Sequence, residues 1–595
     1  MQTLTDAWTA LPADLRTRLA MASTGWRHLA LAGAQCLRLA RQQADADEKA
    51  RLQSLAADIL LWAMGENPLS GPLAAEILSA PDLPLSGTAR AGLSAVASCW
   101  RAPQAKEGGL AYFERLAQRR DAERLADFLA GQIAKDPGGL FWRDKALGLA
   151  LYSGAGELAH RLEGAALSGL EAIPDLGPAA RVLSAQGAFV RGDTELCLDG
   201  LLGDLPPLQQ AYGPAFAAAR VCLALLGAGE NSAALPLARE CLAAAPWQAG
   251  LARTAADAAT GLRARLAPPP GPALIMLYSW NKAADLDATL ASLAASDLST
   301  ADGGRARVAV LDNGSTDNTA QVLDAWAARL NLLRVDLPVN IGAPAARNWL
   351  AALPEARAAE TLVYLDDDVE LPPDWLQRLG AALEARPGAG VVGCKVADHQ
   401  APHLLQNTAG HLVVPGGGPD GGPDGGPDGG PDGAAGDRPD MDFRSMTPNP
   451  FRLCDAHLQG PDWGLFDFVA DCASVTGCCH LFRRADLDKA GPFSLALGPS
   501  QYDDFERDLR MLAKGGVAAC QGHLRVRHRK RSGLASQGTG ADAAGASSNA
   551  LGNRYKMQTM HPREEIAGFI EAQAKRLGEA VEDALRVLDA AGDPS

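Results

Sequence analysis

Three consecutive aspartates, Asp366, Asp367 and Asp368, follow an apolar segment at 361–365 that is typical of a buried strand. In α/β folds, ligands bind beyond the carboxyl ends of the strands, which is where this triplet would lie. Carboxylates in such a position are costly to bury unless they bind a cation or accept many hydrogen bonds. The triplet is therefore the first indication of a site for a nucleoside diphosphate, with a cation or several hydrogen bonds to balance the carboxylates.

A second acidic group, at 502–510, contains Asp503, Asp504 and Glu506. If these residues begin a helix, Asp504 and Asp508 share a face and Glu506 points away. Such residues are also stabilised by the helix dipole, so a purely structural role is the alternative. Two adjacent carboxylates can raise the pKa of one of them towards the range that a general base needs, which favours proton transfer.

A basic stretch at 525–531 contains His528. A neutral imidazole can complete a metal site begun by Asp368. The surrounding arginines, together with Arg347, could neutralise an anionic leaving group close to the acidic triplet. A solvated surface strand is the alternative interpretation of this stretch.

Composition restricts the class of protein. The 595 residues are too many for one core, and the net charge of -15 argues against broad binding to nucleic acid. No apolar run approaches the roughly 18 residues of a membrane-spanning helix. The N-terminus lacks the basic and apolar regions of a signal peptide. We expect a cytoplasmic protein without a transmembrane segment, which could also bind peripherally at the inner face of the membrane.

The 11 cysteines are scattered without a Cys-x-x-Cys pair, which suits a reducing compartment. Cys472, Cys478, Cys479 and His480 lie close together in the sequence, but their spacing matches no standard zinc pattern. Adjacent cysteines in an apolar context usually pack as small hydrophobic residues. We therefore expect no zinc site there.

The N-terminal part, 1–266, has apolar residues at helical spacing and almost no β-branched runs, which predicts an all-α domain. Glycine-bearing turns start at Ser153, Arg191 and Gly227, 38 and then 36 residues apart. This spacing suggests stacked helix hairpins, the last of which resembles a degenerate tetratricopeptide repeat, although a plain helical bundle remains open. Either form would bind a protein partner or support oligomerisation rather than catalyse a reaction.

A proline-rich linker at 267–272 separates the two parts, and strands and helices alternate after it. Strands are expected at 273–278, 308–311, 332–335, 361–365 and 390–396, and helices at 285–293, 320–330, 343–353 and 375–384. Repeated βα units of this length predict a mainly parallel, Rossmann-like, three-layer sheet.

Three further segments are distinct. The insertion at 415–440 repeats Gly-Gly-Pro-Asp and cannot bury apolar area, so we expect it to be disordered. The segment at 533–560 should be flexible and able to cover a ligand, and 561–595 predicts an amphipathic helix.

Four motifs together resemble the family-2 glycosyltransferases of the GT-A fold, over residues 273–532. The motifs are 277–282 at the first strand, 310–319 with Asp312 and Asn313, 340–348 with Gly342 and Arg347, and the triplet 366–368 as the family's DxD motif. Farther along, 475–484 resembles the family's acceptor-side helix, and 502–510 resembles its acidic catalytic motif. His528 resembles a downstream metal ligand.

The resemblance implies an inverting transfer of a sugar from a nucleotide-diphosphate sugar to an acceptor hydroxyl, aided by Mn or Mg. Asp504 would be the general base, with Asp503 and Glu506 beside it, and Asp368, Asp366 and His528 would hold the metal. The residues implied to bind the nucleotide sugar are Tyr278, Asn281, Asp312, Asn313, Gly314, Asp317, Gly342, Arg347, Asn348, Asp366 and Asp367. The acceptor, a glycan, a lipid-linked saccharide or a protein, stays open.

Two other classes compete. A nucleotidyltransferase could use a similar sheet with carboxylates and Mg, but the acidic motif followed by His528 fits sugar transfer better. A non-catalytic helical scaffold with a decayed transferase domain is the other, and the intact acids at Asp312, Asp366, Asp368 and Asp504 argue against decay. Two departures from the family pattern are the insertion between the acidic motifs and the Tyr-Asp-Asp context at 502–504.

Overall fold

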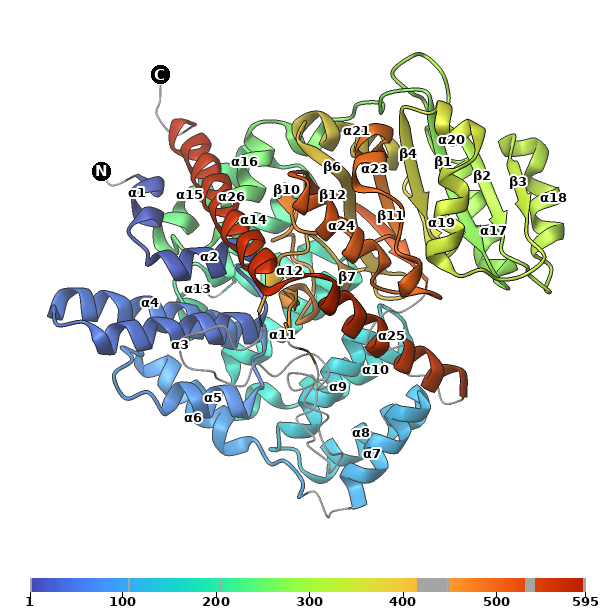
Figure 1. The fold of residues 1–595 in the computed structure, drawn as a ribbon. Helices are drawn as coiled ribbons and strands as arrows, with labels where there is room; N and C mark the ends of the chain where they lie inside the picture. Colours follow the sequence, from blue (N-terminus) through green and yellow to red (C-terminus); the bar gives the residue numbers. More distant parts are fainter. Residues whose placement is uncertain are drawn as a thin grey trace. The chain divides into compact units, whose positions relative to one another are not determined.

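The computed structural model describes residues 3–104, 108–203, 205–414, 447, 449–529 and 541–591 (Figure 1). The expected insertion at 415–440 lies outside the described residues. Two compact units are present, one formed by Met1–Thr260, Asp455–Leu465 and Gly578–Ser595, and the other by Gly261–Cys454 and Phe466–Leu577. We refer to them as the helical unit and the sheet unit.

The helical unit is all α, as its sequence predicts. Its helices are α1 (Leu4–Thr9), α2 (Ala13–Met21), α3 (Trp26–Gln42), α4 (Ala46–Glu66), α5 (Gly71–Leu78), α6 (Gly87–Cys99), α7 (Gly108–Arg119), α8 (Ala122–Lys135), α9 (Phe141–Tyr152), α10 (Glu157–Leu167), α11 (Gly177–Arg191), α12 (Thr194–Leu202), α13 (Leu205–Tyr212), α14 (Phe216–Ala228), α15 (Asn231–Ala244) and α16 (Ala249–Ala259), with short 3-10 turns η1 (Leu170–Ala172) and η3 (Ala456–Leu458). Trp62 packs edge-on against Phe216 and Trp247 in its core.

The three glycine-bearing turns each join two packed helices, α9 to α10, α11 to α12 and α14 to α15. Gly154, Gly192 and Gly229 adopt left-handed backbone angles there, with φ of 79°, 77° and 83°. This conformation favours glycine and lets the chain reverse directly after a helix. The regular spacing of these glycines in the sequence therefore corresponds to a series of helix hairpins, each with one such turn.

Among the described residues, no single helix is long and apolar enough to cross a membrane. The pair α13 and α14 passes by length and composition together, but it is bent by 111°. Leu208, Phe216 and Leu223 of this pair are buried within the unit, as core helices are.

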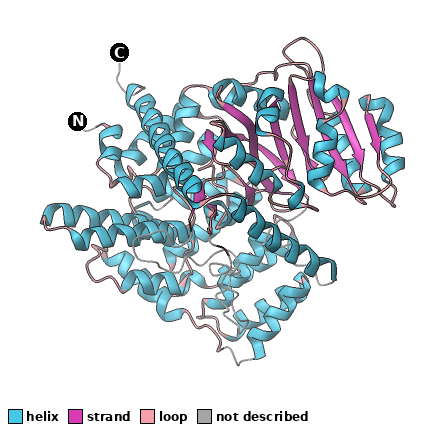
Figure 2. Cartoon of the chain, in the orientation of Figure 1, coloured by secondary structure: helices cyan, strands magenta, loops and turns pink. Residues whose placement is uncertain are grey.

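The sheet unit contains a mixed sheet of 10 strands. Eight of them have the order β10-β12-β6-β11-β4-β1-β2-β3, and β5 and β7 pair with β12 and β6. Strands are drawn in magenta in Figure 2. The strands are β1 (Ala273–Ser279), β2 (Arg307–Asp312), β3 (Leu333–Asp336), β4 (Thr361–Leu365), β5 (Val369–Glu370), β6 (Ala389–Asp398), β7 (Leu405–Asn407), β10 (Val469–Cys472), β11 (Cys479–Arg483) and β12 (Val517–His528); β8 (Leu412–Val413) and β9 (Arg452–Leu453) form a separate ladder. Strands β1, β2, β3, β4, β6 and β12 run in one direction, so the sheet is mostly parallel as predicted.

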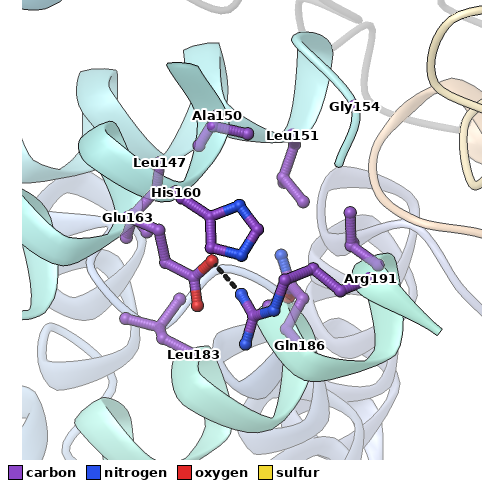
Figure 3. Close-up of a pocket in the computed structure, with 12 residues that line it drawn as sticks. Leu147, Ala150, Leu151, Gly154, His160, Glu163, Leu183, Gln186 and Arg191 are labelled. Carbon is purple, nitrogen blue, oxygen red and sulfur yellow. Dashed lines mark hydrogen bonds and ion pairs between the residues drawn. The ribbon is translucent and has the colours of Figure 1, made fainter. Parts of the chain in front are cut away.

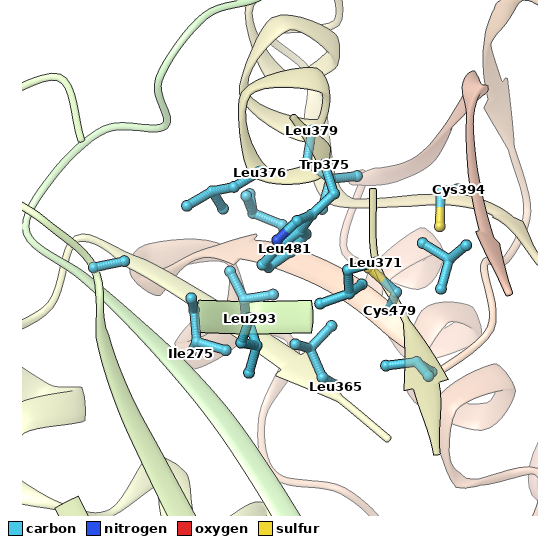
Figure 4. Close-up of a cluster of buried hydrophobic side chains, with 14 of the residues drawn as sticks. Ile275, Leu293, Leu365, Leu371, Trp375, Leu376, Leu379, Cys394, Cys479 and Leu481 are labelled. Carbon is cyan, nitrogen blue, oxygen red and sulfur yellow. The ribbon is translucent and has the colours of Figure 1, made fainter. Parts of the chain in front are cut away.

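Helices cover both faces of this sheet. They are α17 (Ala283–Ala294), α18 (Thr319–Leu330), α19 (Ala343–Ala351), α20 (Pro354–Ala358), α21 (Trp375–Ala385), α23 (Arg484–Ala490), α24 (Asp503–Ala513), α25 (Ala541–Met560) and the first part of α26 (Arg563–Ala590), with short turns η2 (Leu262–Ala264) and η4 (Leu495–Leu497). Alternate residues of β1 enter different cores, because successive side chains of a strand point to opposite faces. Ile275 and Leu277 pack with α17 and α21, whereas Leu274 and Met276 pack with α19. Figure 4 shows Ile275 in the first of these cores, with Leu293 and Leu376. The predicted α/β fold is therefore a three-layer arrangement.

The expected strands and helices between 273 and 396 are present, with ends shifted by a few residues. Two segments differ from expectation. Within 475–484, expected to be helical, residues 479–483 form β11, and α25 occupies much of the segment expected to be flexible. β11 lies between β4 and β6 and is buried on both faces, so its short apolar run has no period that separates a strand from a helix.

Leu481 tests the importance of this inserted strand. Its side chain is fully buried between the layers (Figure 4), so Leu481→Ala should lower the free energy of unfolding of the sheet unit by about 2–5 kcal/mol. Leu495 is 67% exposed, and Leu495→Ala should change it by less than about 0.5 kcal/mol. Urea denaturation of the wild type and the two variants measures both changes in the free energy of unfolding. Similar changes for the two variants would contradict the buried position of β11.

Candidate active site

The acidic triplet lies at the end of β4, in a turn that α17 holds in place. Asp366 donates its N–H to the carbonyl of Cys478, 3.0 Å away. The buried hydroxyl of Thr289 lies 3.0 Å from the carbonyl oxygen of Asp367 and 2.9 Å from that of Val369, and it accepts the Val369 N–H. Cys478 and Thr289 thus fix the backbone of the turn, so the side-chain carboxylates of the triplet are not needed for this.

Lys282 and His528 contact the triplet from different segments. The ammonium of Lys282 lies 2.7 Å from Oδ2 of Asp368 and 3.0 Å from Oδ1 of Asp367. His528 Nε2 lies 2.9 Å from Oδ1 of Asp368 and 3.9 Å from Oδ2 of Asp366. Burial alone would raise the pKa of Asp368, but His528 and Lys282 hold it well below the ordinary value. Asp368 is therefore an anion in this site.

The other two carboxylates of the triplet are affected mainly by burial. Burial raises the pKa of Asp366 to about 6, against the opposing charge of Arg347. It also raises the pKa of Asp367, which Lys282 opposes. The three neighbouring carboxylates therefore differ in how readily they ionise.

Gln406, which belongs to none of the motifs of the sequence, orients the imidazole of His528. Its Nδ1 lies 2.8 Å from the side-chain oxygen of Gln406, on β7, so the N–H on Nδ1 donates to that amide. In the neutral ring this leaves the lone pair of Nε2 facing the carboxylate of Asp368. Two acceptors at 2.9 Å repel each other unless a proton or a metal ion lies between them. Burial lowers the pKa of His528, yet Asp368 raises it overall.

The donors of this group fit a divalent cation. Ligand atoms of Asp366, His528 and Cys478 lie within 4.8 Å of one another, and Asp368 adds a further oxygen. Carboxylate oxygens with one imidazole suit Mg or Mn. Cys478 is buried, and its pKa is raised well above the usual value, first by burial and then by Asp366, so its thiol stays protonated. The residues predicted as metal ligands, Asp366, Asp368 and His528, are thus brought together.

Arg347 lies at the centre of the site. It is 5% exposed, its Nη1 pairs with Asp503, and its Nη2 lies 3.6 Å from Asp366. The rings of Tyr278 and Phe493 lie 5.5 and 5.4 Å from its guanidinium. Although burial disfavours the charged form, the surrounding acidic groups raise the pKa of Arg347 well above its ordinary value. It remains a cation and joins the two acidic motifs.

Asp504 lies beside this centre at the start of α24. Its Oδ2 accepts the N–H of Gly477 at 2.7 Å. A Cβ at Gly477 would lie 2.6 Å from Nη2 of Arg347 and 3.1 Å from Oδ2 of Asp504, so only glycine fits between them. Burial raises the pKa of Asp503, against the opposing charge of Arg347. Asp504 is less buried than Asp503, which leaves its carboxylate nearer to solvent.

The loop before α24 is held in an unusual conformation. Gln501 and Tyr502 have φ of 80° and 68°, a region that costs a non-glycine residue about 1 kcal/mol or more. Asn553 of α25, which is fully buried, donates to the carbonyls of Leu497 at 2.7 Å and Ser500 at 2.9 Å. α25 therefore stabilises the loop from which Asp503 and Asp504 project.

A second buried layer lies under α24. Asp508 accepts hydrogen bonds from the hydroxyl of Ser474 at 2.8 Å and the N–H of Val475 at 3.1 Å. Its partner Arg507 is fully buried and lies 3.6 Å away, over the ring of Phe482. Glu506, predicted beside the base, pairs instead with Arg510 at 2.7 Å. Its short contacts are not with the Arg347 group.

The residues predicted to hold the nucleotide form a network after β1, β2 and β3. Asn313 accepts the N–H of Ile341 at 2.9 Å, and Asp312 accepts that of Ser315 at 2.8 Å. Further hydrogen bonds join Thr316 to Asn281 at 2.7 Å, Ala283 to Asp317 at 3.0 Å, and Asn313 to Asn340 at 2.9 Å. Because Asn281 is followed by Lys282, this network adjoins the triplet.

Glycine is required in that network. Gly314 has φ of 78°, and a Cβ there would lie 2.6 Å from the backbone of Val339. Gly342 has φ of 82° at the start of α19, where the next N–H donates to the carbonyl of Pro499. Asn348 exchanges two hydrogen bonds of 2.8 Å with the backbone of Phe493, so it fixes α19 and does not face the triplet.

The predicted basic stretch is only partly described. Arg527 pairs with Glu370, and the N–H of Arg529 donates to the carbonyl of Asp368 at 2.9 Å. Residues 530 and 531 lie outside the described residues. The sequence analysis gave no role to Lys282, Thr289, Gln406 or Asn553. Of these four residues, only Lys282 lies within one of its motifs, 277–282.

A pocket in the helical unit lies among α9, α10 and α11 (Figure 3). His160, Glu163 and Arg191 line it beside Leu147 and Leu183, and Arg191 pairs with Glu163. Its charged groups therefore satisfy each other.

Residues 275–408 match the model of a family described as Glycosyl transferase family 2. This range begins in β1 and ends just after β7, so it contains Asp312, Arg347 and the triplet, whereas α24 and His528 follow it. Residues 275–408 are thus similar to a family-2 glycosyltransferase domain. No curated protein sequence matches the chain.

Solved structures of glycosyltransferases resemble parts of the chain. GalNAc-T7 with UDP, GalNAc and Mn2+ is 13% identical over 45% of this chain and 44% of that chain, with a TM-score of 0.30. TarS of S. aureus is 15% identical over 44% and 37%, with a TM-score of 0.27. The mannosyltransferase PcManGT from Pyrobaculum calidifontis, with GDP-Man and Mn2+, is 16% identical over 63% and 88%, with a TM-score of 0.31.

The chain spans less than half the length of the first two of these proteins. With TM-scores this low, the similarity to a glycosyltransferase domain is supported by the family match at 275–408 and not by these structures.

Asp508 gives the sheet unit a pH dependence. Burial, opposed by Arg507, raises the pKa of Asp508 to about 7, whereas an unfolded aspartate has about 3.9. The folded state therefore holds an extra proton between these values, and its stability falls as the pH rises from about 4 to about 7. In Asp508→Asn this fall should be smaller, as measured by urea denaturation across the range.

Asp488, whose side chain is 56% exposed and pairs with Arg484, provides the control. Asp488→Asn should keep the wild-type slope. Asp508→Asn also changes the hydrogen bonds with Ser474 and Val475 at every pH in this range, so only the slopes are compared. Equal slopes for Asp508→Asn and the wild type would contradict the raised pKa.

Proposed function

We propose that this protein is an inverting glycosyltransferase that moves a sugar from a nucleotide-diphosphate sugar to an acceptor hydroxyl. The family match at 275–408 supports the class of reaction. The observation that carries the proposal is the buried bridge of Arg347 between Asp366 and Asp503. This bridge joins the donor-side acidic motif to the acidic motif that would activate the acceptor.

The donor nucleotide would bind at the ends of β1, β2 and β3. The carboxylate of Asp312 can accept an N–H of the base, and Asn281 and Asn313 hold the surrounding loops. The close approach of Gly314 to Val339 keeps these loops compact. Asp366 and Asp367 would then lie at the ribose and diphosphate end, because Lys282 follows Asn281 and already contacts Asp367.

A divalent cation would be held by Asp366, Asp368 and His528. When bound, it would neutralise the negative charge of the diphosphate leaving group. Gln406 keeps the hydrogen of the His528 ring on Nδ1, which leaves Nε2 available as a ligand. Mn and Mg both suit this donor set.

Asp504 would be the general base. Its carboxylate removes the proton of the acceptor hydroxyl while the oxygen attacks the anomeric carbon and the bond from that carbon to the diphosphate oxygen breaks. The products are the glycosylated acceptor, protonated Asp504 and a nucleoside diphosphate. One displacement inverts the anomeric configuration, so the chain needs no nucleophile of its own. The N–H of Gly477 orients the carboxylate, and Arg347 stabilises its charge.

Turnover of a panel of nucleotide sugars, with Mn, with Mg and with a chelator, tests this proposal. Asp504→Asn should lower turnover by roughly 100- to 10,000-fold and keep donor affinity, because a base acts only in the chemical step. Asp368→Ala should no longer bind the donor, and added metal should no longer raise its turnover.

Asp488→Asn, an exposed surface change, should leave both properties unchanged. Metal-dependent release of a nucleoside diphosphate supports transfer, whereas release of pyrophosphate would identify a nucleotidyltransferase. Absence of donor binding under every condition would favour a scaffold. Full turnover by Asp504→Asn would exclude this residue as the base.

Asp312 tests the nucleotide end separately. Asp312→Ala should weaken binding of a nucleoside diphosphate by about 10-fold or more, since one hydrogen bond to the base is lost and the turn at Ser315 loosens. Calorimetric titration measures the affinity. Asp324→Ala removes a carboxylate that is 75% exposed on α18 and should bind as the wild type does. Unchanged binding by Asp312→Ala would contradict the predicted base contact.

A further inference from the structure

Lys282 occupies the carboxylates that a divalent cation would need. Its ammonium is 2.7 Å from Asp368 and 3.0 Å from Asp367, and one third of its side chain is exposed. Two carboxylates at these distances favour the charged form of the ammonium. It is therefore a permanent positive charge inside the acidic triplet.

Lys282 and Arg347 offset two of the four carboxylate charges of this site. Lys282 faces Asp367 and Asp368, while Arg347 faces Asp366 and Asp503. A divalent cation that binds alone at Asp368 would add two positive charges beside the ammonium of Lys282. Like charges that share one carboxylate repel strongly in a partly buried site. A cation that binds together with a diphosphate brings its own negative charge, so the repulsion is removed.

Lys282 is also able to move. It is the residue directly before α17, its ammonium is reached by a flexible four-carbon chain, and it follows Asn281 in the predicted nucleotide loop. A diphosphate bound at that loop would offer anionic oxygens to the ammonium. Lys282 could then leave Asp368 without losing an ionic partner.

We propose that Lys282 is an internal counter-cation that couples binding of the divalent cation to binding of the donor diphosphate. It weakens binding of the cation alone and transfers to the diphosphate when both ligands are present. This inference depends on the proposed function, because it takes Asp368 as a ligand of the cation. By thermodynamic linkage, the cation must strengthen diphosphate binding by the same factor as the diphosphate strengthens cation binding.

A supporting role alone would give the opposite result. If Lys282 only held Asp367 and Asp368 in place, its removal would disorder the ligands and weaken the cation. If Lys282 competes with the cation, its removal strengthens the binding of the cation alone. The sign of the change separates the two roles without any measurement of activity.

The test is a titration of the full chain with Mn2+, in which electron paramagnetic resonance measures the free ion. The titration is made with and without UDP, GDP or inorganic pyrophosphate. For the wild type we expect a single Mn2+ that binds weakly alone and at least about 10-fold more tightly with one of the diphosphates, within the usual range of coupling. Lys282→Met should bind Mn2+ alone about 10-fold more tightly than the wild type, with little further gain from the diphosphate.

Two variants complete the experiment. Lys282→Arg keeps the charge and should retain the coupling, which also shows that the position tolerates substitution. Lys514→Met removes an exposed lysine that donates only to a backbone carbonyl, and it should behave as the wild type.

Unchanged or weaker binding of Mn2+ alone by Lys282→Met would overturn the inference while leaving the proposed reaction intact. So would undiminished coupling in that variant. If the wild type binds no Mn2+ with any diphosphate, the cation site of the proposed function fails, and the inference fails with it.

Discussion

The buried guanidinium of Arg347 is the interaction on which the site depends. It lies between Asp366, after β4, and Asp503, the first residue of α24. A buried charge of either sign is unstable without its partner, so each of these elements fixes the position of the other. Gly477 leaves the space that Arg347 and Asp504 occupy. The two acidic motifs therefore form one site, although their residues come from different layers of the sheet unit.

The surrounding fold supports this bridge from both sides. α19 carries Arg347 and is tied by Asn348 to Phe493, and its first N–H donates to Pro499. The same loop continues into Asp503 after two residues in the left-handed region, and Asn553 of α25 holds it. Backbone strain of this kind persists only when neighbouring contacts over-determine the conformation. Helix α25 supplies those contacts.

Much of the fold was predictable because its signals are local. Alternating apolar strands and amphipathic helices between 273 and 396 appear in the order expected, since periodicity depends only on near neighbours in the sequence. The acids Asp366, Asp368 and Asp503 were singled out by runs of neighbouring acidic residues, which are also local signals. The segment at 479–483 was misjudged as helical because a strand buried on both faces has no amphipathic period. Glu506 was grouped with the base by its motif, whereas its contacts are with Arg510.

The sequence by itself indicated the class of the domain, the succession of strands and helices between 273 and 396, and the acidic groups that could form a site. Only the tertiary structure decided which partners these groups have. Arg347 and Asp503 are 156 residues apart, His528 and Gln406 are 122 apart, and Lys282 and Asp368 are 86 apart. A pattern of neighbouring residues contains no information about contacts at such separations. The charge balance of a buried site depends on all of those contacts together, because in a low-dielectric interior each carboxylate is affected by every nearby charge.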